Sequence, residues 1–192
     1  MRQRYTGLLC VLAILLACLS FGVRSASAVR AAGTFTDTQG RFTFAIPDGL
    51  TPDDTYTGQR SGGAEIAAVL LSDATADSAV FHDNVNVTVT PFNGDTMNLD
   101  DLAQATVQRV SNALHATPDG TGIQSLTIAG LPAREYGYLA VSNGVTVHGR
   151  QAFVIYGDNA FVITFTASED TYADFLAQSH DILTSFTFNP AM

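Results

Sequence analysis

The stretch VTVHGRQAFVIYGDNAFVITFT, residues Val145 to Thr166, decides the fold of this chain. Its two halves are rich in β-branched and aromatic residues, and the turn-forming residues Gly157, Asp158 and Asn159 separate them. This pattern predicts two long strands that form a hairpin. An isolated hairpin is only marginally stable in water, so other parts of the chain must cover its apolar face.

Two amphipathic helices are expected to provide that cover. The first has an apolar stripe with helical spacing, made of Leu99, Leu102, Ala103, Val107, Val110, Ala113 and Leu114. The second stripe runs from Tyr172 to Phe186, and Ser168 is placed to cap the start of that helix. Further strands are predicted at 41–46, 64–71, 84–90, 123–128 and 133–142. The sequence therefore predicts an α+β domain, an antiparallel β-sheet flanked by helices.

The N-terminal residues predict export. A short basic segment, an apolar run from Leu8 to about Val23 and the small-residue pattern Ala26-x-Ala28 are typical of a secretory signal peptide. We expect residues 1–28 to be cleaved, 29–33 to form a short tether and 34–189 to form one domain. We therefore expect an extracytoplasmic protein, whether secreted, periplasmic or lumenal.

Two alternatives to simple cleavage remain open. The segment Leu15 to Cys18 resembles a bacterial lipobox, in which Cys18 would be lipidated. The apolar run could also stay uncleaved as a membrane anchor, although its length of about 16 residues is short of the roughly 20 that a membrane span needs. Membrane association is expected only if Cys18 is lipidated or the signal is retained.

The cysteine content shows how the domain must be stabilised, and its charge excludes one class of partner. Both cysteines, Cys10 and Cys18, lie in the predicted signal, so the remaining domain has no disulfide and must be stabilised by its apolar core. Removal of the signal leaves six arginines, no lysine and eighteen acidic residues, a net charge of −12. Because such a surface repels phosphates, we expect no nucleic-acid partner.

Five short motifs occur along the chain in a characteristic order. The first is an aromatic–apolar step that ends in Pro-Asp-Gly (Phe42–Gly49), and the second is an Asn-Val-x-Val strand (Asn84–Val89). An Ile-Ala-Gly-Leu-Pro-Ala turn (Ile128–Ala133), a long hairpin (Ala160–Thr166) and a closing helix (Ile182–Phe186) follow. From about Phe35 to Phe188 the chain resembles the PsbP-like superfamily, which includes the photosystem II extrinsic protein and bacterial envelope proteins of the DcrB and LpqN type. The resemblance implies an α/β/α sandwich and a mostly non-catalytic role, docking on membrane complexes or acting in the envelope. The basic docking residues of photosystem II members have no counterpart here, because lysine is absent.

Few residues of the sequence indicate a catalytic or metal-binding site. The weak candidates for a metal site are His82, Asp83 and His148, which would need tertiary contacts to converge on one ion. Exposed polar side chains are the simpler interpretation of all three. There is no Gly-x-Ser-x-Gly motif for a serine nucleophile. We therefore predict a protein with no enzymatic activity and no cofactor.

Two groups of aromatic and polar residues lie on predicted strands. His148, Arg150 and Tyr156 share one strand face by their even spacing and form a possible docking face. Tyr136 and Tyr138 could be exposed with Tyr156, but core packing is the more common outcome for such residues.

The functional prediction has two alternatives. We expect a monomeric, exported, non-enzymatic domain that docks on an envelope or membrane-associated protein complex. The alternative is a carrier or binding protein for a small apolar or lipidic ligand, held between the sheet and a helix.

Overall fold

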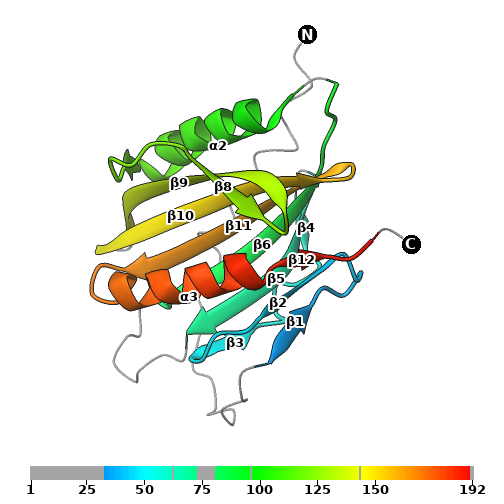
Figure 1. The fold of residues 1–192 in the computed structure, drawn as a ribbon. Helices are drawn as coiled ribbons and strands as arrows, with labels where there is room; N and C mark the ends of the chain where they lie inside the picture. Colours follow the sequence, from blue (N-terminus) through cyan, green and yellow to red (C-terminus); the bar gives the residue numbers. More distant parts are fainter. Residues whose placement is uncertain (1–32, 62, 73–80, 96, 143, 191–192) are drawn as a thin grey trace.

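The computed structural model describes residues 33–61, 63–72, 81–95, 97–142 and 144–190 of the chain (Figure 1). The predicted signal peptide with Cys18, and the tether up to residue 32, lie outside these residues. Within the described ranges, neither helix is long and apolar enough to span a membrane.

A large antiparallel sheet forms the centre of the domain. Its strand order is β3 (Leu50–Pro52), β5 (Ala64–Ser72), β6 (Asn84–Pro91), β11 (Asn159–Ser168), β10 (Val145–Tyr156), β9 (Leu131–Ser142) and β7 (Thr117–Pro118). Two short strands lie beside this path, β4 (Arg60–Ser61) on β5 and β8 (Gln124–Ile128) on β9. All the strands predicted for residues 64–71, 84–90, 123–128 and 133–142 are confirmed within a few residues.

The predicted hairpin is confirmed as β10 and β11. The two strands pair from Tyr156 opposite Asn159 to Val147 opposite Ser168. The turn is one residue shorter than expected, because Asn159 already belongs to β11. Gly157 has a positive φ of 56°, a conformation that glycine adopts at little cost in a tight hairpin turn.

Both predicted helices are present. Helix α2 (Leu99–Leu114) begins with a capping box, in which the Asn98 side chain accepts from the amide of Asp101 and the Asp101 side chain accepts in return. Helix α3 (Tyr172–Ser185) begins after Thr171, so the prediction that Ser168 caps it was wrong. Ser168 instead ends β11, because its backbone pairs with β10.

The apolar stripe of α2 differs from the prediction at two positions. Ala113 is exposed, whereas Thr106 is buried together with Leu102, Ala103 and Val110. Thr106 can be buried because its hydroxyl donates a hydrogen bond to the carbonyl oxygen of Leu102 over 2.9 Å. A hydrophobicity pattern alone does not show such a local hydrogen bond.

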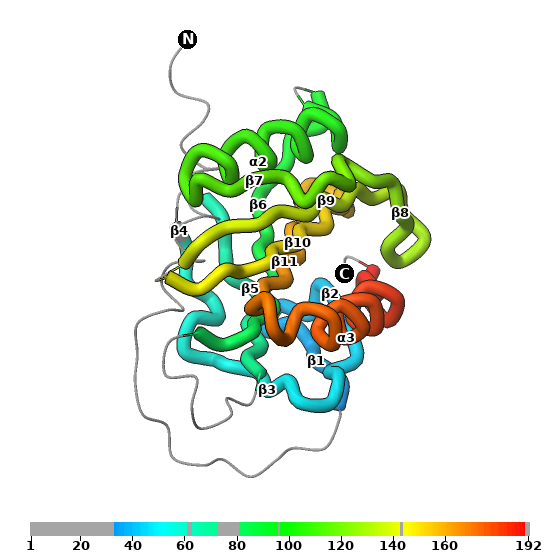
Figure 2. The backbone as a smooth tube through the Cα atoms, turned by 90° about the vertical axis from the view of Figure 1, so that its left-hand side faces the viewer, coloured from blue at the N-terminus to red at the C-terminus, as the bar shows by residue number. Residues whose placement is uncertain are grey.

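The helices cover opposite faces of the central strands, as Figure 2 shows. Helix α2 packs with residues of β9, β10 and β11 in one apolar cluster. Helix α3 shares the other cluster with a small sheet of β1 (Thr34–Thr36), β2 (Phe42–Ala45) and β12 (Thr187–Phe188). The α+β class is confirmed, but the sandwich description holds only in part because the second cover mixes a helix with a sheet.

Phenylalanine rings join the small sheet to the large one. The ring of Phe42 is fully buried and stacks on Phe186 with centroids 5.0 Å apart. It also meets the edge of Phe161 on β11 at 5.9 Å and lies 6.1 Å from Phe35 and from Phe44. Phe42 therefore contacts every layer on this side of the domain.

Candidate functional site

The residues of the predicted docking face have partners within the molecule. The His148 ring stacks on Tyr172 of α3 with centroids 4.1 Å apart, and its Nε2 lies 2.7 Å from a carboxylate oxygen of Glu169. Arg150 forms an ion pair with Glu135 on the neighbouring strand. Burial opposes the charge of Arg150, but hydrogen bonds and charge from Glu135 outweigh it and raise its pKa.

Tyr156, the third predicted docking residue, lies on the same sheet face. Its ring stacks on Phe188 at 4.5 Å, and its hydroxyl donates to the carbonyl oxygen of Asn189 over 3.2 Å. The three residues thus lie next to α3 and β12 and help to hold them. Docking through this face stays a prediction.

The structure does not bring the three metal candidates together as a site. Asp83 accepts a hydrogen bond from the backbone amide of Ser168 over 3.0 Å, while His148 faces Glu169. Within the described residues, no group of three or more histidine, cysteine, aspartate or glutamate side chains could hold a metal ion.

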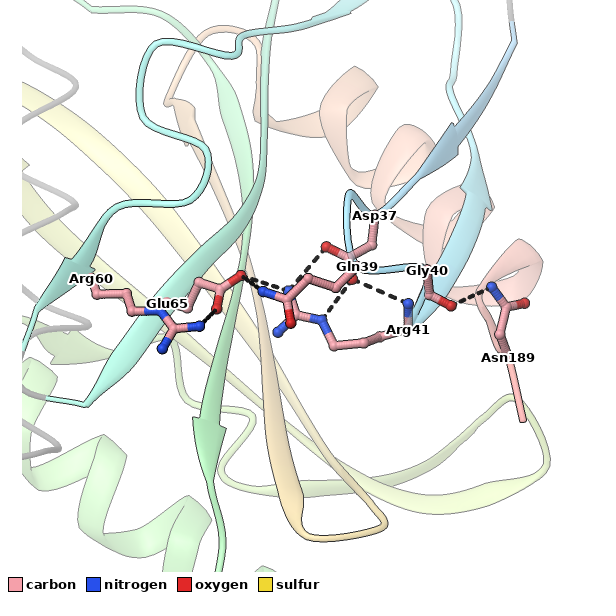
Figure 3. A network of polar contacts seen from close by, with 7 residues as sticks. All are labelled: Asp37, Gln39, Gly40, Arg41, Arg60, Glu65 and Asn189. Carbon is pink, nitrogen blue, oxygen red and sulfur yellow. Dashed lines mark hydrogen bonds and ion pairs between the residues drawn. The ribbon is translucent and has the colours of Figure 1, made fainter. Parts of the chain in front are cut away.

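Charged side chains form a network between β5 and the hairpin of β1 and β2 (Figure 3). Arg41 contacts Asp37 at 2.6 Å and Glu65 at 2.8 Å, and Glu65 also pairs with Arg60 at 2.7 Å. The amide of Gln39 adds a hydrogen bond to Glu65 over 2.7 Å. Two acidic and two basic residues balance one another, so the network holds the two sheets together and has no free charge for a ligand.

We expect this network to weaken in acid. Burial opposes ionisation of Glu65, but hydrogen bonds and charge from Arg41, with further hydrogen bonds from Gln39 and Arg60, outweigh it and lower its pKa below the ordinary 4.5. A lowered pKa stabilises the folded state above pH 4.5, and this stabilisation is lost as the pH falls through the folded pKa. Urea unfolding of the wild type and Glu65→Gln should therefore differ most above pH 5 and converge in stronger acid. A difference that is independent of pH would contradict this assignment.

A second polar group lies on the sheet face beneath α2. Cross-strand pairing places Tyr136, Gln151, Thr164 and Asn86 in one row and Tyr138, Gly149, Thr166 and Asn84 in the next. Directly paired residues point to the same face of a sheet. All seven side chains in these rows are at most 5% exposed. The centre of the sheet therefore has a buried polar surface on one side, which we call the polar face.

Several atoms of the polar face lack a hydrogen-bond partner. Gln151 donates to Thr164 over 3.2 Å, but its own amide oxygen has no partner within the described residues. The same holds there for three further buried atoms of these rows, Tyr136 Oη, Tyr138 Oη and Thr166 Oγ1, and outside the rows for Thr88 Oγ1, His82 Nδ1 and Arg109 Nη1. Each unsatisfied buried group costs about 1–3 kcal/mol, so the four in these rows would together amount to a large fraction of the ~5–15 kcal/mol stability of a whole domain. Bound water or a polar ligand would satisfy these groups.

Tyr138, on β9, stands at one end of its row, and its ring reaches over the next strand. A methyl group on Gly149, its cross-strand partner, would overlap the end of the Tyr138 ring, so the phenol lies directly over the backbone of β10. Burial first, and the neighbouring Tyr136 second, raise the pKa of Tyr138. Its hydroxyl thus stays protonated and can donate a hydrogen bond.

We expect Gly149→Ala to destabilise the protein by about 1–3 kcal/mol, because the new methyl group would overlap the buried ring of Tyr138 and force it to shift. Urea unfolding gives the measurement. The same substitution in a Tyr138→Leu background should cost clearly less, since the two sites are in contact. Equal costs in both backgrounds would show that the ring is not the obstacle.

The sequence analysis did not identify the polar face as a site. It predicted that Tyr136 and Tyr138 pack in the core, and both are buried. The alternation in Asn84–Thr90 was an available signal, because a strand with valines on one face presents only asparagine and threonine on the other. What the pattern could not show is that α2 and its neighbours bury this second face.

Comparison with known proteins identifies the fold. No protein-family model and no curated protein sequence matches the chain. Similar solved structures include cyanobacterial PsbP (CyanoP) from Synechocystis, with a TM-score of 0.59 and 13% identity over 88% of this chain and 99% of that one. LpqN, involved in cell envelope biogenesis of Mycobacterium tuberculosis, has a TM-score of 0.58 and 13% identity over 93% of this chain and 97% of that one.

A third similar structure is the Ran-binding protein Mog1p of Saccharomyces cerevisiae. Its TM-score is 0.52, with 13% identity over 81% of this chain and 94% of that chain. Identities this low carry information on the fold alone, and the three structures agree on it. The chain has a PsbP-like fold.

Proposed function

We propose that this chain is an exported, non-enzymatic binding domain that docks on a protein of the cell envelope. The main support is the match of the whole domain to CyanoP and LpqN, because those chains are covered almost completely. LpqN is involved in cell envelope biogenesis, and Mog1p is a Ran-binding protein. These roles belong to those proteins, but they support binding as a use of this fold.

The arrangement of the charged residues also supports a binding role. In the described part of the chain, the charged groups of the network in Figure 3 and the pairs at Arg134 and Arg150 link elements of the fold to one another. They therefore act as structural contacts. The predicted signal peptide supports an extracytoplasmic location, and we propose that the domain acts there as a monomer.

Site-specific photo-crosslinking in intact cells that produce the full chain tests the proposal. A photoreactive amino acid replaces Asp174, an exposed residue in the first turn of α3 near His148 and Tyr172. The matched control replaces Gln104, an exposed residue on α2 at the opposite face of the sheet. We expect a discrete crosslinked envelope protein from position 174 and little from position 104. No crosslinked protein from position 174, or the same products from both positions, would contradict docking through this face.

A second candidate function is a carrier for a small ligand held between the sheet and a helix. A carrier for an apolar ligand needs an apolar binding surface, whereas the buried atoms without partners beneath α2 are polar. We therefore propose that any ligand carried between the sheet and α2 is polar.

A further inference from the structure

Arg109 differs from the other arginines of the domain. The described residues contain five arginines, and four of them form ion pairs with carboxylates: Arg41, Arg60, Arg134 and Arg150. Arg109, on α2, has no ion pair within the described residues, and its Nη1 is buried without a hydrogen-bond partner. In a chain with twice as many acidic as basic residues, a cation without a carboxylate partner is unexpected.

The side chain of Arg109 nevertheless stays charged. Burial lowers its pKa, yet an arginine remains protonated at neutral pH in almost any protein environment. A partly buried guanidinium without a counter-ion is costly. An anion bound next to it would remove that cost.

The position of Arg109 along the sheet follows from an ion pair. Asp100, at the start of α2, contacts Arg134 of β9 at 2.6 Å. Arg109 lies nine residues further along a helix that rises about 1.5 Å per residue, a distance of about 13 Å. A strand covers that distance in about four residues, at about 3.4 Å each. Because Thr117, which follows α2, pairs with Leu139 of β9, the helix runs along β9 in the same direction and the backbone of Arg109 lies about level with Tyr138.

The groups at this level of the polar face suit a small oxygen-rich ligand. The Tyr138 hydroxyl lies over Gly149, and Thr166 is the partner of Gly149 on the next strand. Gln151 and its partner Tyr136 form the adjacent row. Hydroxyl groups of tyrosine and threonine can donate hydrogen bonds to the oxygens of a carboxylate or phosphate. They can also accept hydrogen bonds from any hydroxyl group that the ligand carries.

We propose that the polar face beneath α2 binds a small molecule that carries an oxyanion, a carboxylate or a phosphate, whose charge is met by Arg109 and whose oxygens accept hydrogen bonds from Tyr138 and its neighbours. Bound water is the other way to satisfy these hydroxyls. Water, however, does not neutralise the charge of Arg109, which is the feature that selects an anion. The inference refines the polar-ligand alternative given above and does not depend on protein docking.

Titration of the full chain with inorganic phosphate and, separately, with acetate tests the proposal. The readouts are the thermal midpoint and the absorbance difference of tyrosine, which is a clean signal because the chain has no tryptophan. We expect saturable changes in both readouts with at least one probe, below about 10 mM. The probe that binds more tightly distinguishes a phosphate ligand from a carboxylate ligand.

Two arginine variants provide the matched comparison. Arg109→Gln should weaken binding of the probe at least about tenfold, the typical effect of losing one charge-assisted hydrogen bond. Arg134→Gln removes the same charge from a surface pair and should leave binding unchanged. Absence of saturable binding of either probe to the wild type, or equal binding by wild type and Arg109→Gln, would overturn the proposal.

Tyr138→Phe separates a binding role from a structural one. If the hydroxyl serves the ligand, this variant should raise the thermal midpoint of the unliganded protein and weaken probe binding several-fold. A lower midpoint with unchanged binding would show that the hydroxyl is structural and would count against the site.

Discussion

Arg41→Gln is expected to destabilise the protein by about 3–5 kcal/mol, the usual cost of leaving a buried charge without its partner. The side chains of Asp37 and Glu65, which Arg41 joins, are 0% and 7% exposed. Without Arg41, Asp37 loses its cation, while Glu65 keeps only Arg60, whose side chain is 69% exposed. Urea unfolding measures the loss as a lower transition midpoint.

The matched control for Arg41→Gln is Arg134→Gln. Arg134 also pairs with a carboxylate at 2.6 Å, but its partner Asp100 is 59% exposed. Exposed pairs contribute about 0–1 kcal/mol, so this variant should unfold almost like the wild type. A similar loss in both variants would mean that the network in Figure 3 is no more than a set of surface ion pairs.

Phe42→Ala is expected to cost about 3–5 kcal/mol in unfolding free energy, as is typical for truncating a fully buried phenylalanine. The ring contacts Phe186 and Phe161, so its loss leaves a cavity between the small sheet, the end of α3 and β11. Several rigid rings border this cavity and cannot collapse to fill it. The measurement is again denaturant unfolding.

The control for Phe42→Ala is Phe92→Ala, because Phe92 is a phenylalanine that is only partly buried at the edge of the other cluster. We expect a clearly smaller loss for it, since less apolar area returns to water. If Phe92→Ala cost as much as Phe42→Ala, the aromatic cluster would not be the main contact between the two sheets.

Local patterns predicted much of the fold. The alternation in Asn84–Thr90, the β-branched runs in Val145–Thr166 and the helical stripe beginning at Leu99 gave elements that are all present. These signals work because side-chain direction has a fixed period in strands and helices. Element ends were less accurate, as at Ser168, because backbone pairing with a distant strand outweighed its capping preference.

Contacts between distant segments could not be predicted in this way. Nothing local to Thr187 and Phe188 indicates that they pair with β2, or that Glu65 meets Arg41. The polar face is a further case, because its rows arise only when β9, β10, β11 and β6 lie in register. Arg109 becomes notable only once the described part of the structure shows no carboxylate partner for it.

The small sheet has a consequence for how the chain folds. Its middle strand, β2, pairs with β12, and Thr43 and Thr187 exchange a hydrogen bond across 144 positions of sequence. Such non-local pairing is slow to form, because a long loop must close before the contact stabilises it. During synthesis, Phe42 and Phe44 have no third strand beside them until Thr187 and Phe188 have been made. The small sheet is therefore completed only after every strand of the large sheet has been made, and the predicted export is compatible with that delay.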